Sequence, residues 1–249
     1  MAFIGQYTWP MIRISAFFMV VPIFGSQLVT PRVRLAIGLL VSLIVTQLVP
    51  QLPPIKSLTI EVMLLVVQQV VIGVTLGFVT QIVFQLFVLA GQMLAMKMGL
   101  GFAAMNDPIN GVSTTVVSQF YLLLTTLLFV SVNGHLILVE VIVNSFTTLP
   151  VGGDGLGADT FWRIVLMGSF MFKSALSIAL PVVTALLIVN MAFGVMTRAA
   201  PQMNVFAIGF PATLVIGVFL LWLSLGYFLP KYMDFIDQGL SMLFSMAKM

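Results

Sequence analysis

The sequence predicts an all-α integral membrane protein built from about six apolar, kinked helical segments. Hydrophobic residues make up 61% of its 249 residues, whereas charged residues make up only 7%. A soluble domain carries roughly 25% charged residues, so this chain could not cover a water-facing surface. The mean hydropathy of +1.19 and several apolar runs of at least ~20 residues, the length of one membrane span, support the same fold class.

The composition also excludes several classes of function. There are no cysteines, so the chain has no disulfide, no thiolate nucleophile and no cysteine-ligated metal. The net charge of +3 comes from scattered Lys and Arg residues, without the basic run that is typical of nucleic-acid binding. With a single histidine, the chain cannot readily supply a Ser-His-Asp arrangement. We therefore predict a non-enzymatic protein with no cofactor, no metal and no nucleic-acid partner.

The first two apolar runs cover residues 10–29 and 35–49. Arg13 lies near one end of the first run, where a long side chain can extend to the lipid headgroups, and we expect it to do so. Pro22 predicts a kink or break in that run. The second run ends at Pro50 and is short for a full crossing of the membrane.

The third run, residues 62–96, has no charged residue until Lys97 and is longer than one crossing needs. Gly73 and Gly77 give a GxxxG spacing that lets another helix backbone approach, although this motif alone is weak evidence. Amide side chains on a lipid face would lack hydrogen-bond partners. We therefore expect five glutamines of this region to point at other helices or at a wet lumen: Gln68, Gln69, Gln81, Gln85 and Gln92.

The stretch from residue 91 to 115 is the irregular centre of the chain. Its glycines allow backbone conformations that a regular helix does not favour, and Pro108 biases Asp107 away from helical geometry. An apolar irregular segment between two membrane helices should lie against protein or line a cavity, because bare backbone in lipid is costly. Two interpretations remain open: a loop folded into the middle of an assembly, and an ordinary connection with a few buried methionines.

The remainder of the chain predicts three further apolar runs, at residues 112–139, 161–196 and 205–230. Residues 150–159 form a polar, glycine-rich surface connection between the first two of these. Pro181 predicts a kink in the fifth run. Beyond Pro230, apolar residues recur at helical spacing, so we expect a separate amphipathic helix at the C-terminus.

Two non-enzymatic functions fit these elements. A secondary transporter would hold a solute or ion with polar groups near the membrane centre, and its candidates are Asp107, Glu140 and Lys173. A channel or gate subunit would need a constriction that can seal, which flexible methionine side chains can provide. Met93, Met96 and Met98 are the candidates for such a seal.

Several short segments, in this order and spacing, carry a resemblance to a known family. They are Arg13 followed by residues 22–25 (PIFG), residues 31–34 (PRVR), residues 99–102 (GLGF) with Asp107-Pro108, Gly134-His135, Ser145-Phe146 with Leu149-Pro150, and residues 198–206 (RAAPQMNVF). Over essentially its whole length the chain resembles the FliR/SctT family of type III secretion export-gate proteins. The Gly-His and Pro-Gln-Met-Asn segments are similar to flagellar rather than virulence-type members.

The resemblance implies one subunit of a helical export gate in the bacterial inner membrane, within the flagellar basal body. It implies FliP and FliQ subunits as partners in a hetero-oligomer, FlhB on the cytoplasmic side, unfolded flagellar proteins as export substrates, and contact with membrane lipid. Residues 1–160 would form a FliP-like part and residues 161–249 a FliQ-like helical hairpin that ends in the amphipathic helix. The alternative is a secondary transporter or small-ion channel of the inner membrane.

The resemblance also implies two functional segments. The loop near residues 101–118 would plug the export channel, with candidate gate residues Gly101, Phe102, Met105, Asp107, Pro108 and Gly111. The turn of the C-terminal hairpin would contact the cytoplasmic partner through Arg198, Pro201, Gln202 and Asn204.

Overall fold

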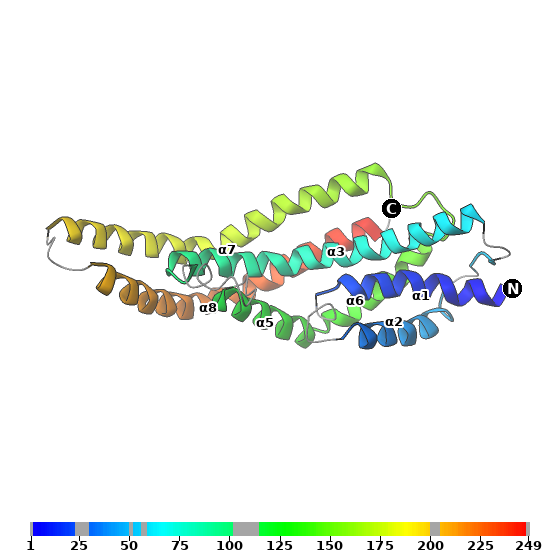
Figure 1. Ribbon diagram of the computed structural model, residues 1–249, viewed down its shortest axis with the longest axis horizontal. Coiled ribbons are helices and arrows are strands. Elements are labelled where there is room, and N and C mark those ends of the chain that lie inside the picture. Colours follow the sequence, from blue (N-terminus) through cyan, green and yellow to red (C-terminus); the bar gives the residue numbers. More distant parts are fainter. Residues whose placement is uncertain are drawn as a thin grey trace. The chain divides into compact units, whose positions relative to one another are not determined.

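A computed structural model describes residues 2–22, 30–49, 52–55, 59–101, 115–199 and 205–247. Within these ranges the chain is helical and contains no strand, which confirms the predicted fold class. Figure 1 shows the helices in chain order, coloured from the N-terminus to the C-terminus. Their bounds are α1 Ala2–Val20, α2 Pro31–Val45, α3 Ile60–Lys97, α5 Val116–Ser131, α6 Gly134–Thr148, α7 Ala158–Ala199 and α8 Val205–Ala247.

Three of these helices are long and apolar enough to cross a membrane: α3, α7 and the Gly209–Met246 part of α8. A fourth span results if α5 and α6 are counted as one broken span. The described ranges therefore contain three or four candidate membrane spans. The sequence predicts about six apolar segments, and fewer than six of them are long enough to cross a membrane. At ~1.5 Å per residue, α3, α7 and α8 each exceed the ~30 Å of a bilayer core.

The first two runs form shorter helices than a span requires. The helix α1 begins at Ala2, earlier than residue 10, and ends at Val20, which confirms a break at Pro22. The helix α2 begins with Pro31 at its first position, where the missing amide hydrogen costs no helical hydrogen bond. Its 15 residues confirm that this run is short for a crossing.

Two boundaries differ from the sequence prediction. The fourth run is interrupted at Asn133, whose φ of 58° is left-handed, and α5 and α6 meet there at 72°. Pro230 does not end a helix, because α8 continues through it to Ala247. The C-terminal segment is therefore the last part of a long helix. Proline is tolerated inside a helix when the carbonyl four residues earlier finds another partner or water.

The chain divides into two compact units, and α3, α5, α7 and α8 each contribute residues to both. Unit 1 comprises Met1–Val83, Leu128–Gly168 and Asp237–Met249, whereas unit 2 comprises Phe84–Leu127 and Ser169–Ile236. The core of unit 1 contains Trp9, Phe17 and Phe146, and that of unit 2 contains Phe87 and Tyr232. The expected FliP-like and FliQ-like parts, 1–160 and 161–249, stay a prediction.

In unit 1, the GxxxG spacing of α3 brings α1 into close contact. A Cβ atom added at Gly73 would collide with the backbone carbonyl of Arg13, and one at Gly77 would lie 2.9 Å from the Cβ of Val20. Both glycines thus face α1, as the sequence motif predicted.

Candidate functional site

The predicted plug loop leaves α3 at a well-defined point in unit 2. Gly99 has a φ of 85°, and its amide donates to the carbonyl of Met96 at 3.3 Å. The Leu100 amide donates to the Ala95 carbonyl at 2.9 Å. These two bonds around a left-handed glycine form a Schellman motif, which satisfies the last carbonyls of the helix and ends it. Gly101 is the last described residue before the loop.

The chain re-enters helix at Thr115, also in unit 2. Thr115 Oγ1 accepts a hydrogen bond from the Ser118 amide at 3.3 Å and shares another with Ser118 Oγ at 2.9 Å, so it caps the start of α5. A Cβ atom added at Gly91 would lie 2.8 Å from Ser118 Cα, so α3 and α5 nearly touch there. The helix that follows the loop therefore packs against α3 near its start. Phe102, Met105, Asp107, Pro108 and Gly111 lie outside the described residues.

The three candidate seal methionines have different surroundings. Met93 is half-buried, and Met96 is 60% exposed in this chain. Met98 is only 1% exposed, because it packs against α8 at Gly217, where an added Cβ atom would lie 2.6 Å from the methionine Cγ. Met98 thus fastens the end of α3 to α8, and Met96 is the member of the set whose side chain is free to meet another molecule.

The predicted partner loop begins at the end of α7. Arg198 lies in the last turn of α7 and is exposed. A basic side chain there interacts favourably with the negative end of the helix dipole. Pro201, Gln202 and Asn204 lie outside the described residues.

Arg13 lies at the centre of unit 1, fully buried, so the expectation that it extends to lipid headgroups is wrong. Its Nε and Nη2 donate to the side-chain oxygen of Gln69, the former at 2.8 Å. Its Nη1 donates to the carbonyl and hydroxyl of Ser145 at 2.7 and 3.1 Å, and Nη2 also reaches the Leu149 carbonyl at 2.8 Å. The guanidinium lies 4.1 Å from the Phe146 ring centroid. All five N–H donors of the arginine are therefore used, each on an uncharged acceptor.

This arginine ties α1 to two helices that are distant in sequence, since its acceptors lie on α3 and at the C-terminal end of α6. Gln69 is completely buried, and Gln68 beside it donates to the Gly153 carbonyl at 2.8 Å. Gln69 thus points at another helix, as expected, whereas Gln68 bonds to the connection between α6 and α7. Gln85 is exposed in this chain.

In unit 2, Pro181 creates a second polar contact between helices. Proline has no amide hydrogen, so the carbonyl four residues earlier, that of Ser177, receives no bond within α7. Lys231 of α8 replaces that bond: its Nζ donates to the Ser177 carbonyl at 2.6 Å and to the hydroxyl at 2.8 Å. This contact fastens α7 to α8 close to Pro181, where the sequence predicts a kink.

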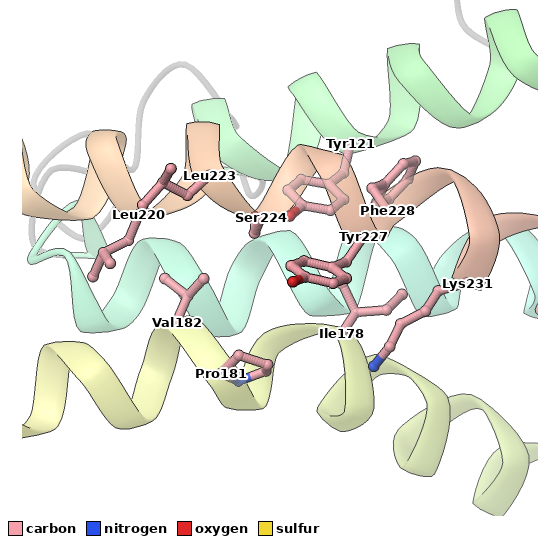
Figure 2. Close-up of a pocket in the computed structure, with 10 residues that line it drawn as sticks. All are labelled: Tyr121, Ile178, Pro181, Val182, Leu220, Leu223, Ser224, Tyr227, Phe228 and Lys231. Atoms are coloured by element: carbon pink, nitrogen blue, oxygen red, sulfur yellow. The ribbon is translucent and has the colours of Figure 1, made fainter.

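A hollow of about 450 Å³ lies beside this contact, lined by residues of α5, α7 and α8 (Figure 2). Most of its lining is apolar, and Lys231 is its one charged residue. Only one of the two sides of this contact could be predicted from the sequence. Pro181 predicts a disturbance of α7. Lys231, which bonds to Ser177, lies 54 positions further along the chain and could not be predicted as its partner.

The described residues offer little for transport chemistry or metal binding. Glu140 and Lys173 are both exposed, and Asp107 lies outside the described ranges. Among the residues that the structure describes, no group of three or more His, Cys, Asp or Glu residues could hold a metal ion.

Comparison with known proteins places the whole chain in one family. Residues 4–239 match the family described as bacterial export proteins, family 1. The chain belongs to this export-protein family. It is 34% identical to the flagellar biosynthetic protein FliR of Pectobacterium carotovorum over 98% of this chain and 91% of that relative. It is 34% identical to FliR of Escherichia coli K12 over 89% of this chain and 84% of that relative. It is 30% identical to FliR of Bacillus subtilis 168 over 84% of this chain and 82% of that relative.

The resemblance to the FliR family is thereby confirmed. In this member of the export-protein family, sequence reasoning missed the Arg13 cluster and the contact between Lys231 and Ser177. Both depend on residues that are far apart in the chain and meet only after folding.

Proposed function

We propose that the chain is a non-enzymatic subunit of the flagellar type III protein export gate in the bacterial inner membrane. The match of residues 4–239 to a bacterial export family carries this proposal, together with relatives that are named flagellar biosynthetic protein FliR. No described residue favours the alternative of a secondary transporter or small-ion channel, because Glu140 and Lys173 lie on the surface of this chain.

The apolar surface of the chain supports a place within a larger assembly. Only 22% of the most apolar window of α7 and 17% of that of α8 are buried. These surfaces need lipid or other apolar protein around them. We propose that FliP and FliQ subunits cover part of them, with residues 1–160 in a FliP-like role and residues 161–249 as a FliQ-like hairpin.

The loop between α3 and α5 is the proposed plug of the export channel. The Schellman motif at Gly99 and the cap at Thr115 end α3 and begin α5 at defined residues on either side of this loop. At rest, Phe102, Met105 and their neighbours would exclude water and ions, and Met93 and Met96 would add flexible apolar contacts. Unfolded substrates would displace them during export.

The turn between α7 and α8 is the proposed contact with an FlhB-like cytoplasmic partner. Gln202→Ala and Asn204→Ala should each weaken capture of this partner in detergent, because each removes a side-chain amide that can hydrogen-bond across the interface. Asp154→Ala, on the exposed surface connection of unit 1, is the matched control and should leave capture unchanged. Capture by both amide variants at the wild-type level would refute this role for the turn.

Deletion and complementation test the function itself. Cells that lack the gene should retain flagellar proteins that are normally exported, and the wild-type chain should restore export. A complex purified in mild detergent should have the mass of a hetero-oligomer that includes FliP and FliQ subunits. Normal export in the deletion strain, or a purified chain that is a stable monomer without partners, would contradict the proposal. Loss of uptake of a small solute instead would favour the transporter.

A further inference from the structure

The hollow in unit 2 has one polar end and one apolar end. Figure 2 shows Lys231 at one end of the group of lining residues and Leu220 towards the other, with Ser224 and Tyr227 of α8 between them. Ile178 and Pro181 of α7 form the facing wall. On α8 the lining extends from Leu220 to Lys231, which corresponds to roughly 16 Å along the helix axis. The hollow, which we call the slot, therefore extends along α8 and has a cation at one end.

The charged residues of α7 and α8 indicate that this cation lies at a lipid headgroup level. Residues 174–197 of α7 carry no charge and are bounded by Lys173 and Arg198; residues 205–230 of α8 carry none and are followed by Lys231. These segments are about 36 and 39 Å long, close to the ~30 Å of a bilayer core. Lys231 bonds to Ser177, one helical turn from Lys173, so both lysines lie at the same end of the paired segments.

The slot runs from this level into the uncharged part of the helix pair. Every other lining residue of α8 precedes Lys231 in the uncharged segment, and the α7 lining residues also lie within its uncharged segment. Tyr227 lies one turn from Lys231 and is 78% exposed, which is typical of a tyrosine at a membrane interface. A ligand with an anionic head and an apolar tail matches this order of groups.

The ammonium group can still bind such a head. It has three N–H donors, and the carbonyl and hydroxyl of Ser177 accept two hydrogen bonds from it. The third donor can reach a phosphate oxygen at the mouth of the slot. Lysine at this depth attracts anionic headgroups by its charge as well.

The lining of the slot selects an apolar occupant. The slot of about 450 Å³ has a mostly apolar lining, with Lys231 as its one charged residue. A single methylene chain is thin enough to enter, and it would cover the apolar side chains that line the slot.

We propose that this slot binds one acyl chain of an anionic phospholipid, with the lipid phosphate at Lys231. The bound lipid fills the space between α5, α7 and α8 beside Pro181. This inference goes beyond the proposed function and holds whether or not the chain lines an export channel.

The direct test is photolabelling of the unaltered protein. The full-length chain, with the partner subunits that it retains in mild detergent, is reconstituted in nanodiscs containing phosphatidylglycerol with a diazirine near the end of one acyl chain. After illumination, peptide mass spectrometry should find label concentrated on lining residues towards the end of the slot away from Lys231, such as Leu220, Leu223 and Val182. Label on the exposed Leu187 and Ile188 of α7 without label in the slot would overturn the proposal. Lipid label found only on a neighbouring subunit would overturn it as well.

Two pairs of variants separate a built site from general lipid contact. Ser224→Trp fills the slot and should remove its label, whereas Leu187→Trp, on the exposed face of α7, should leave that label unchanged. Lys231→Met should lower the preference for phosphatidylglycerol over phosphatidylcholine by roughly fivefold, the contribution of one lysine. Lys231→Arg should retain this preference. Lys173→Met should also retain it, and an equal loss in Lys173→Met would show surface attraction alone and refute the site.

Discussion

Replacing Gln69 by leucine tests the buried arginine cluster of unit 1 most sharply. Leucine is of comparable size but accepts no hydrogen bond, so the Nε and Nη2 donors of Arg13 lose their shared acceptor. A hydrogen bond to a charged group contributes about 1.5–3 kcal/mol, and here two are lost around a guanidinium that has no access to water. We expect Gln69→Leu to lower the free energy of unfolding by about 3–5 kcal/mol.

The adjacent Gln68 offers a matched control on the same helix. Its amide donates a hydrogen bond to the Gly153 carbonyl in an exposed loop and accepts one from Gln69 Nε2 at 3.3 Å. Both bonds join uncharged groups, so Gln68→Leu should cost about 1–2 kcal/mol. Gln69→Glu keeps the acceptors and places a carboxylate against the buried guanidinium. It should therefore retain more stability than Gln69→Leu.

The buried Trp9 provides the assay, because it lies in the same unit and is only 1% exposed. Its indole donates to the Pro53 carbonyl at 2.9 Å, so its fluorescence should change when unit 1 unfolds. Trp162 and Trp222 are 63% and 64% exposed, and replacing them by phenylalanine leaves Trp9 as the sole reporter. Unfolding is followed in detergent with increasing denaturant. Equal stability of the Gln69→Leu and Gln68→Leu proteins would refute the role assigned to the cluster.

Two further substitutions test how helices are held together within each unit. Gly73→Ala should destabilise the protein by about 1–3 kcal/mol in the same unfolding assay, because its Cβ atom collides with the Arg13 carbonyl. Gly226→Ala meets no atom within 4 Å and should be neutral or stabilising; equal costs would argue against close packing of α1 on α3. Lys231→Met should cost about 1–2 kcal/mol, and much less in a Pro181→Ala background, where the Ser177 carbonyl can bond within α7. Additive losses in this double-mutant cycle would show that Lys231 does not replace the bond that Pro181 removes.

The parts of the fold that depend on local chemistry could be predicted from the sequence. The small side chain at Gly73 allows another helix to approach, and α1 packs there. Gly99 was one of the glycines that marked irregular backbone, and it adopts the left-handed conformation that ends α3. The apolar runs likewise revealed the helices, since their length and lack of charge are local properties.

The failures involve partners that lie far apart in the chain. Position within its own apolar run suggested that Arg13 reaches the headgroups, but its acceptors at Gln69 and Ser145 lie 56 and 132 positions away. Proline lacks an amide hydrogen and disfavours the interior of a helix, so the sequence predicts that a helix ends at Pro230. The helix α8 nevertheless continues through it. Asn133 breaks the fourth run through a left-handed backbone that asparagine tolerates, which hydropathy does not report.

Membrane permeability after replacement of the proposed plug shows whether this loop seals the export channel. Residues 102–111 are replaced by a glycine-serine segment of equal length, and a second strain carries the same replacement at residues 151–157 in the surface connection of unit 1. Both gates should assemble, as judged by the mass of the purified complex. Only the first strain should leak small ions across its inner membrane. If the gate assembles without residues 102–111 and the membrane stays impermeable to small ions, this loop is not the plug.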